Sequence, residues 1–315
     1  GGRNSRVSRV DLANGRSVAV KEYFTAPGDG RDRLGVEFGA LAFLRQHGMR
    51  SVPAPLARDG ADLGIYEWKE GTRAGRTPRA GDVEAMAEFL LRLAALAVQA
   101  REAGLPPASD ACFSFAGAVA AVRARLDRFR AVEDRDFHAL YRELESELDV
   151  AEASGRARLA VARIEPEAGL APGLHTLSPS DFGLHNALRG PDGLCFVDFE
   201  FCGLDDPAKM VADILLHPGM DLSQRDAEAF VGLLAQGLPG DVGFTERLWA
   251  GYRLHGVKWC LIACNEFLGN ERARRNFAGS GGAGARERSL ARARAMLDAL
   301  RQSENFWRPP LAAWD

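Results

Sequence analysis

Three side chains that could take part in one reaction lie within a short stretch of the sequence. Asp181 and Asn186 have four residues between them, and Asp198 follows in the run 196–200. A carboxylate can accept a proton from a hydroxyl group, and carboxylate and amide oxygens are the ligands that Mg²⁺ prefers. Phosphoryl transfer needs these parts, because its catalysis is mostly positioning and charge neutralisation. We therefore predict that Asp181 is a base and that Asn186 and Asp198 bind Mg²⁺; the alternative is that they form turns or end a strand.

A lysine near the start of the chain is a further candidate. Lys21 lies in the apolar run 17–23, where a charged amine is costly unless it is paired. Glu37, in the helical pattern that follows, is the natural partner, and this ion pair would aim Lys21 at the phosphates of a nucleotide. The alternative is a lysine that faces solvent on an edge strand.

The first residues could complete a phosphate site. Gly1 and Gly2 begin a turn that continues through Asn4 and Ser5 into a β-rich run. Glycines let backbone N–H groups come close to phosphate oxygens, so this turn is a candidate phosphate loop because it precedes Lys21.

Two patterns predict the elements that must position these residues. The first is β-rich, with strands expected at residues 6–10, 17–23 and 63–68 and a helix at residues 34–47. The second is mainly helical, with helices expected at residues 82–97, 111–130, 135–154 and 155–167, short strands at 174–201, and helices again at 207–303. The change of pattern near Glu70 predicts an N-lobe of residues 1–70 and a C-lobe of residues 71–315.

Composition excludes several classes of protein. The 315 residues carry a formal net charge of −3, so the basic field of a nucleic-acid binder is absent. No stretch reaches the roughly 18 apolar residues that span a bilayer. Five cysteines without CxxC spacing predict buried thiols and a cytoplasmic location.

The order of these motifs resembles the aminoglycoside phosphotransferase and choline kinase group of protein-kinase-like enzymes. The residues that carry the resemblance are Gly1, Gly2, Asn4, Ser5, Lys21, Glu37, Glu67, Trp68, Asp181, Asn186, Asp198, Phe199, Glu200, Asp206 and Pro207. The resemblance implies an α+β, protein-kinase-like fold with a small antiparallel-sheet lobe and a larger, mainly helical lobe. It also implies a kinase that holds ATP or GTP with Mg²⁺, the purine against the backbone near Glu67 and Trp68, and transfers a phosphoryl group to a hydroxyl of a small molecule.

The sequence departs from this group beside the candidate base. Pro179 stands two residues before Asp181 and Gly183 two residues after it, where the group usually has histidines. His185 could take over their role, but we expect it to pack or to face solvent. The departure leaves one alternative open, a nucleotide-binding module that is catalytically silent and regulates a partner.

The last quarter of the chain bears on the acceptor. Residues 241–315 contain 12 Lys or Arg against 8 Asp or Glu, a field that disfavours an aminoglycoside-like polycation and favours a neutral or anionic sugar-like metabolite. Lys258, Trp259, Asn265 and Glu266 could bind such a ring and its hydroxyls. The alternative, which we expect, is that Trp259 is a core residue and that Lys258 and Glu266 are on the surface.

Overall fold

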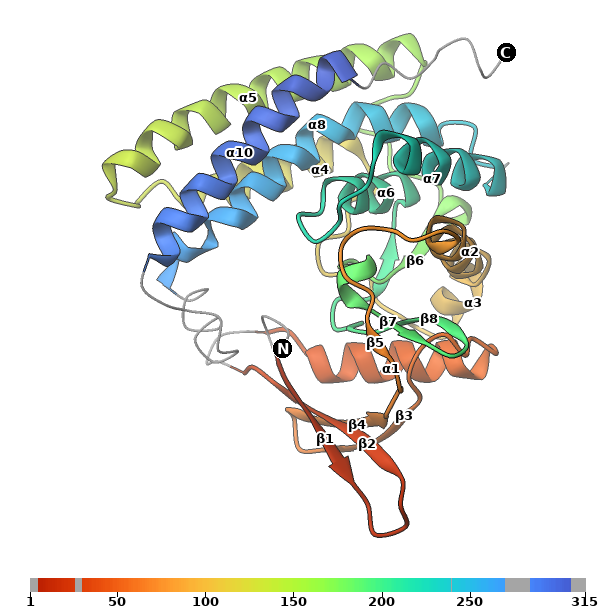
Figure 1. Cartoon of the computed structure of the whole chain (residues 1–315). Coiled ribbons are helices and arrows are strands. Elements are labelled where there is room, and N and C mark those ends of the chain that lie inside the picture. Colours follow the sequence, from red (N-terminus) through yellow and green to blue (C-terminus); the bar gives the residue numbers. More distant parts are fainter. Residues whose placement is uncertain (1–4, 26–29, 239, 270–283, 307–315) are drawn as a thin grey trace.

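The computed structural model describes residues 5–25, 30–238, 240–269 and 284–306 (Figure 1). Three of the predicted phosphate-loop residues, Gly1, Gly2 and Asn4, lie outside this part of the chain. The fold is α+β, with a small antiparallel sheet at one end and a mostly helical larger part, as the sequence predicts (Figure 1).

The small lobe is a four-stranded antiparallel sheet with one helix against it. Its strands have the order β1-β2-β4-β3. Their bounds are Ser5–Asp11 (β1), Ser17–Tyr23 (β2), Pro55–Asp59 (β3) and Leu63–Glu67 (β4), and the helix is Arg33–Gln46 (α1). The predicted hairpin, helix and last strand are confirmed. β3 was not predicted, because its residues are mostly exposed and lack a regular apolar alternation.

The larger part begins with a short strand that pairs outside the small sheet. β5 (Thr72–Arg73) pairs with β7 (Ala187–Gly190), which pairs with β8 (Gly193–Phe196), and β6 (Thr176–Ser178) pairs with β9 (Gly203–Asp205). The helices are α2 (Asp82–Ala95), α3 (Ala97–Glu102), α4 (Phe115–Asp127), α5 (Arg135–Val161), α6 (Pro207–Leu216), α7 (Gln224–Gly237), α8 (Phe244–Ala263) and α10 (Ala285–Phe306). The lobe boundary after Glu70 stays a prediction.

One helix runs through a glycine where the sequence suggested two helices. α5 continues through Gly155 to Val161. A Cβ atom at Gly155 would lie 2.3 Å from the Phe115 ring and 2.7 Å from the Ala250 carbonyl oxygen. The glycine therefore lets α5 pack closely against α4 and α8, and this packing offsets its low helix propensity.

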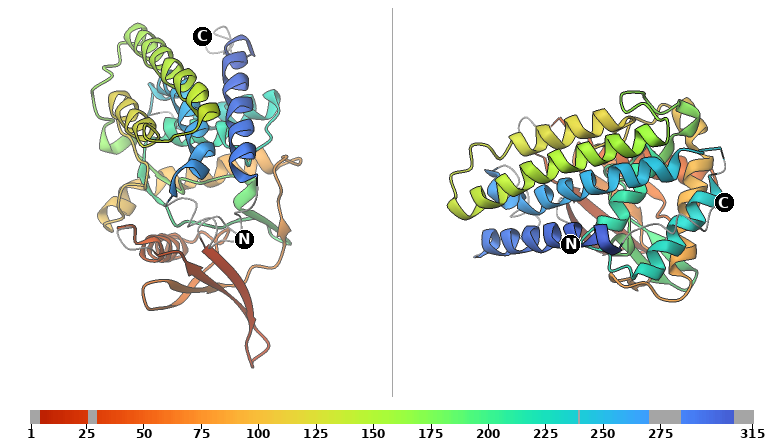
Figure 2. Two further views of the ribbon diagram at one scale, coloured as in Figure 1. Left: turned by 90° about the vertical axis from the view of Figure 1, so that its left-hand side faces the viewer. Right: turned by 90° about the horizontal axis from the view of Figure 1, so that it is seen from above.

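α8 is the central helix of the larger part (Figures 1 and 2). It packs against α4, α5, α6 and α10, and these helices share an apolar core that includes Leu140, Leu254 and Leu297. A second core joins the small lobe to α2 and to the strands that carry the candidate site. Within it, the Phe89 ring contacts Phe182, Phe196 and Phe199, with centroid distances of 5.6, 4.4 and 6.4 Å. These rings fix the backbone directly after Asp181 and on both sides of Asp198.

No helix within the described ranges is both long and apolar enough to cross a membrane. All five cysteines are free thiols, and Cys202, Cys260 and Cys264 are buried.

Candidate active site

The predicted ion pair of Lys21 and Glu37 forms, and Asp198 joins it. Lys21 Nζ lies 2.6 Å from Glu37 Oε2 and 2.6 Å from Asp198 Oδ1. Period-two alternation places Lys21 on the inner side of β2, where it is buried. α1 carries Glu37 across from it, and Asp198 follows β8. The three residues thus bring the two lobes together at one point.

This cluster holds more negative than positive charge. Glu200 Oε2 lies 3.8 Å from Lys21 Nζ, so one ammonium group faces the three carboxylates of Glu37, Asp198 and Glu200. Burial alone would lower the pKa of Lys21, but these carboxylates outweigh it and hold the pKa above its ordinary value. The net charge of about −2 would suit a divalent cation.

Further hydrogen bonds fix Glu37. The Tyr23 hydroxyl donates to Glu37 Oε2 at 2.6 Å, and the Phe199 N–H donates to Glu37 Oε1 at 3.2 Å. The Tyr66 hydroxyl lies 2.6 Å from that of Tyr23. Glu37 therefore has both carboxylate oxygens bonded, so its role is to hold Lys21 and the segment after Asp198.

The segments that carry Asp181 and Asp198 have an unusual backbone. Ser180 and Asp198 have φ angles of 70° and 71°, in the left-handed region that non-glycine residues seldom occupy. The Ser180 N–H donates to Ser178 Oγ at 3.1 Å, and Asn186 Nδ2 donates to the Asp181 carbonyl oxygen at 2.9 Å. Strained backbone of this kind clusters at functional sites. The loop consequently places Asp181, Asn186 and Asp198 on the wall of one cavity.

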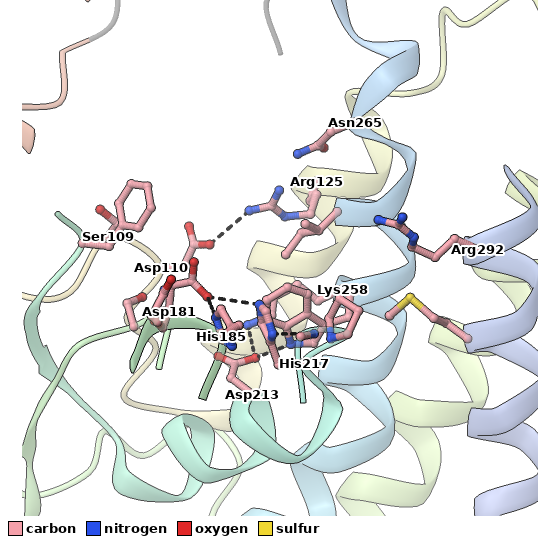
Figure 3. Close-up of a pocket in the computed structure, with 18 of the residues that line it drawn as sticks. Ser109, Asp110, Arg125, Asp181, His185, Asp213, His217, Lys258, Asn265 and Arg292 are labelled. Atoms are coloured by element: carbon pink, nitrogen blue, oxygen red, sulfur yellow. Dashed lines mark hydrogen bonds and ion pairs between the residues drawn. The ribbon is translucent and has the colours of Figure 1, made fainter. Parts of the chain in front are cut away.

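Two histidines hold the side chain of Asp181. His185 Nε2 lies 3.0 Å and His217 Nε2 3.1 Å from Asp181 Oδ1, and the two rings stack with centroids 3.9 Å apart (Figure 3). Burial raises the pKa of Asp181, but the two imidazoles outweigh it and lower the pKa below its ordinary value. The expectation that His185 merely packs or faces solvent is wrong. His217 was missed, because it follows α6, far from the loop in sequence, and no spacing links the two.

A cavity of about 810 Å³ opens beside these residues. Its wall includes the predicted base and metal ligands and, opposite them, side chains of α4, α8 and α10 (Figure 3). The volume lies within the range of small-molecule sites, roughly 300–1,000 Å³. There is room for an acceptor of the size of one or two sugar rings.

α8 and the residues directly after it contribute side chains to this wall that we expected to lie in the core or on the surface. Lys258 and Glu266 are 7% and 5% exposed, so the expectation that both are surface residues is wrong. Lys258, Trp259 and Asn265 line the cavity. Asp213 Oδ1 accepts from the Trp259 indole N–H at 3.0 Å and lies 2.5 Å from Lys258 Nζ, which fixes both side chains.

Of the remaining residues predicted to contact the nucleotide, the structure describes Ser5, Glu67 and Trp68. Ser5 begins β1 and is buried opposite Tyr23. The Glu67 carboxylate accepts from the Ala54 N–H at 3.0 Å, and the Trp68 indole donates to Glu70 at 2.9 Å. These two side chains stabilise the segment that links the lobes, so a purine contact at Glu67 and Trp68 would have to use the backbone.

The protein resembles known proteins in its structure rather than in its sequence. No family model matches the sequence, and neither does any curated protein. Choline kinase from Cryptosporidium parvum has a similar structure, with a TM-score of 0.61 at 13% identity over 100% of this chain and 91% of that one. The fold is that of the small-molecule kinases.

Antibiotic-modifying enzymes share this small-molecule kinase fold. Spectinomycin phosphotransferase, solved with ADP and spectinomycin, has a TM-score of 0.61 at 11% identity over 96% of this chain and 90% of that one. A thermostable mutant of an aminoglycoside phosphotransferase has a TM-score of 0.56 at 15% identity over 96% and 92%. The sequence resemblance to this group is thereby confirmed at the level of the fold.

Proposed function

We propose that the protein is an ATP- or GTP-dependent phosphotransferase that moves the γ-phosphoryl group to a hydroxyl of a small molecule. The observation that carries the proposal is the convergence of Lys21, Asp198 and Asp181 at the junction of the lobes. Lys21 and Asp198 are in contact, and Asp198 and Asp181 line the same cavity. An amine for the phosphates, a metal ligand and a base are the parts that phosphoryl transfer requires.

The residues fit a magnesium ion. Asp198 uses Oδ1 for Lys21, and Asn186 uses Nδ2 for the Asp181 carbonyl, so within the described residues Asp198 Oδ2 and Asn186 Oδ1 have no partner. Both are hard oxygen ligands, and the excess negative charge of the Lys21 cluster favours a divalent cation. When bound, Mg²⁺ would neutralise charge on the phosphates.

The protein groups then have separate tasks. Lys21 would contact the nucleotide phosphates, and Asp181 would orient the acceptor hydroxyl. As the acceptor oxygen bonds to the γ-phosphorus, the bond from that phosphorus to the bridging oxygen breaks, the nucleoside diphosphate leaves, and the hydroxyl proton passes to Asp181. Its lowered pKa makes Asp181 a weak base, which suits a loose transition state in which little proton transfer is needed early.

Titration calorimetry with ATP and GTP, with and without Mg²⁺, followed by a phosphate-transfer screen over hydroxylated metabolites, tests the proposal. We expect metal-dependent nucleotide binding and transfer to one class of acceptor. Binding without transfer would favour the catalytically silent regulatory module, for which Pro179 is the supporting feature. No binding of either nucleotide would contradict both functions.

The variant Asp181→Asn tests the base. We expect turnover to fall by about 10²- to 10⁴-fold, the usual contribution of a general base, while nucleotide affinity measured by calorimetry stays within about twofold. The amide keeps a hydrogen-bonding oxygen for His185 or His217, so the loop should persist. Turnover equal to that of the parent protein would remove Asp181 from the base role.

A further inference from the structure

The cavity beside Asp181 is lined by more positive than negative side chains. The cationic residues are Arg31, Arg76, Arg125, Arg128, Lys258 and Arg292, and the anionic ones are Asp110, Asp181, Asp198 and Asp213. Among the described residues, six cations against four anions give the wall an excess of two positive charges. The excess lies at the wall itself, where a bound acceptor would meet it.

Two of the four carboxylates are paired with a cation of the same wall. Asp213 lies 2.5 Å from Lys258, and Asp110 lies 3.2 Å from Arg125. Asp213 also lies 3.2 Å from Lys209, a second buried ammonium. Asp198 belongs to the negative Lys21 cluster, where the proposed magnesium ion would bind. Away from that cluster, a cationic acceptor would therefore find little uncompensated negative charge.

Arg292 offers a positive charge that no other described residue pairs with. It is exposed on α10 and extends toward Arg125 on the far side of the cavity from Asp181 (Figure 3). Within the described residues, no hydrogen bond or ion pair holds its guanidinium group. The same holds for the side chain of Arg76. A guanidinium group with its donors unused is suited to a carboxylate or phosphate, which it can bind through two parallel hydrogen bonds.

A buried amide points to the same space. Asn265 is 5% exposed and lines the cavity, yet its Oδ1 atom has no hydrogen-bond partner in the described structure (Figure 3). A buried acceptor without a donor is costly, so it marks a position where water or a ligand donates. A sugar-like hydroxyl would satisfy it once the Asn265 side chain turns this oxygen, which is buried, toward the cavity.

From these observations we propose that the acceptor is an anionic, polyhydroxylated small molecule, a sugar acid or sugar phosphate. Arg292 would bind its carboxylate or phosphate, Asn265 would accept from a hydroxyl, and a second hydroxyl would reach Asp181. This inference rests on the proposed function and defines its substrate class. Such an acceptor is opposite in charge to a polycationic antibiotic, which the positive wall of this cavity would repel.

Four probes that differ chiefly in charge test the proposal: glucose, glucosamine, glucuronate and glucose 6-phosphate. Calorimetry with the whole chain in the presence of Mg²⁺ and a non-hydrolysable ATP analogue measures their affinity. We expect at least one of the two anionic probes to bind at least tenfold more tightly than glucose, and glucosamine to bind most weakly. Carboxylate and phosphate recognition are distinguished by which of the two anions binds better.

Arg292→Gln supplies the residue-level test, with Arg294→Gln as its matched control. Arg294 lies two residues further along the same helix, but its guanidinium group donates to the Asp136 carbonyl oxygen outside the cavity. We expect Arg292→Gln to weaken the anionic probe by about tenfold and Arg294→Gln to leave it unchanged. Nucleotide affinity should be unaffected by either variant.

The proposal is overturned if neither anionic probe binds measurably, if glucosamine binds best, or if Arg292→Gln weakens the nucleotide rather than the anion. These results are separate from a failure of the proposed function, which would appear as loss of Mg²⁺-dependent nucleotide binding in the same titrations.

Discussion

The two sides of the candidate site hold charge in different ways. On the nucleotide side, Lys21 is buried against Glu37, Asp198 and Glu200, and its position is fixed before any ligand arrives. On the acceptor side, Asp181 is 37% exposed and Arg292 is unpaired within the described chain. Under the proposed function, the first side would hold the nucleotide in a fixed geometry, whereas the second leaves charges unpaired for a particular acceptor. Changes on the two sides should therefore have different consequences.

The largest effect should come from removing the metal ligand. We expect Asp198→Ala to reduce Mg²⁺-dependent turnover by more than about a thousandfold, because a metal and its ligands contribute several kcal/mol to the transition state. Steady-state kinetics over a range of Mg²⁺ concentrations would measure this. Asp192→Ala, an exposed aspartate in the turn between β7 and β8, is the control. Turnover of Asp198→Ala equal to that of the parent protein at every Mg²⁺ concentration would show that the metal binds elsewhere.

The buried ion pair gives a prediction about stability rather than chemistry. Lys21→Met leaves Glu37 and Glu200 buried without a cation, so we expect unfolding to require about 3–5 kcal/mol less free energy. The double variant Lys21→Met, Glu37→Gln should recover part of this loss while remaining inactive. Urea denaturation measures both proteins. If the single and double variants were equally unstable, the charge of Glu37 would not be the cause.

A smaller effect on turnover is expected for His217, which holds the proposed base. His217→Asn removes one of the donors to Asp181 Oδ1, so the carboxylate should lose its fixed orientation and kcat should fall by about ten- to a hundredfold. The KM for the nucleotide should not change, because Lys21 and Asp198 are untouched. His138→Asn, at an exposed position of α5, provides the comparison. An unchanged kcat would mean that His185 alone holds the base.

The smallest effect concerns pH and a histidine behind the cavity. Burial, with Lys258 and Lys209 nearby and Asp213 opposing them, lowers the pKa of His255 to about 3. In the unfolded chain this histidine binds a proton below about pH 6.5. The free energy of unfolding should therefore fall as the pH decreases from 6.5, by up to about 1.4 kcal/mol per pH unit from this group.

His255→Gln should flatten that dependence. Urea denaturation of the parent protein and the variant at pH 7, 6 and 5 would show the difference in slope. Identical slopes would mean that His255 takes up its proton in the folded state as well.

The sequence predicted the nucleotide side better than the acceptor side, and the reason is physical. Lys21 and Glu37 occupy regular elements whose periodicity fixes which face each side chain occupies. Asp181, Asn186 and Asp198 follow one another within a short segment, so their closeness needs little tertiary information. Local patterns therefore sufficed to predict that these five residues lie close together, while their roles stay predictions.

The acceptor side depends on contacts between distant segments. His217 reaches Asp181 only because α6 packs against α8. Asn265 is buried because the 3-10 turn after α8 (Cys264–Phe267) packs against α10 and α8. Burial of Lys258 also requires Asp213, which supplies its counter-charge. None of these contacts has a signature in spacing or composition. Sequence reasoning therefore missed His217 and expected Lys258 on the surface, and it named Asn265 as a candidate without predicting its burial.

The hydrogen bond from the Phe199 N–H to Glu37 crosses from one lobe to the other. A single amide proton therefore reports on the distance between the lobes. Its exchange with deuterium requires that bond to open, and its protection measures how often α1 separates from the segment after Asp198. Exchange of the Phe199 amide proton thus measures lobe opening without an added dye or an introduced cysteine.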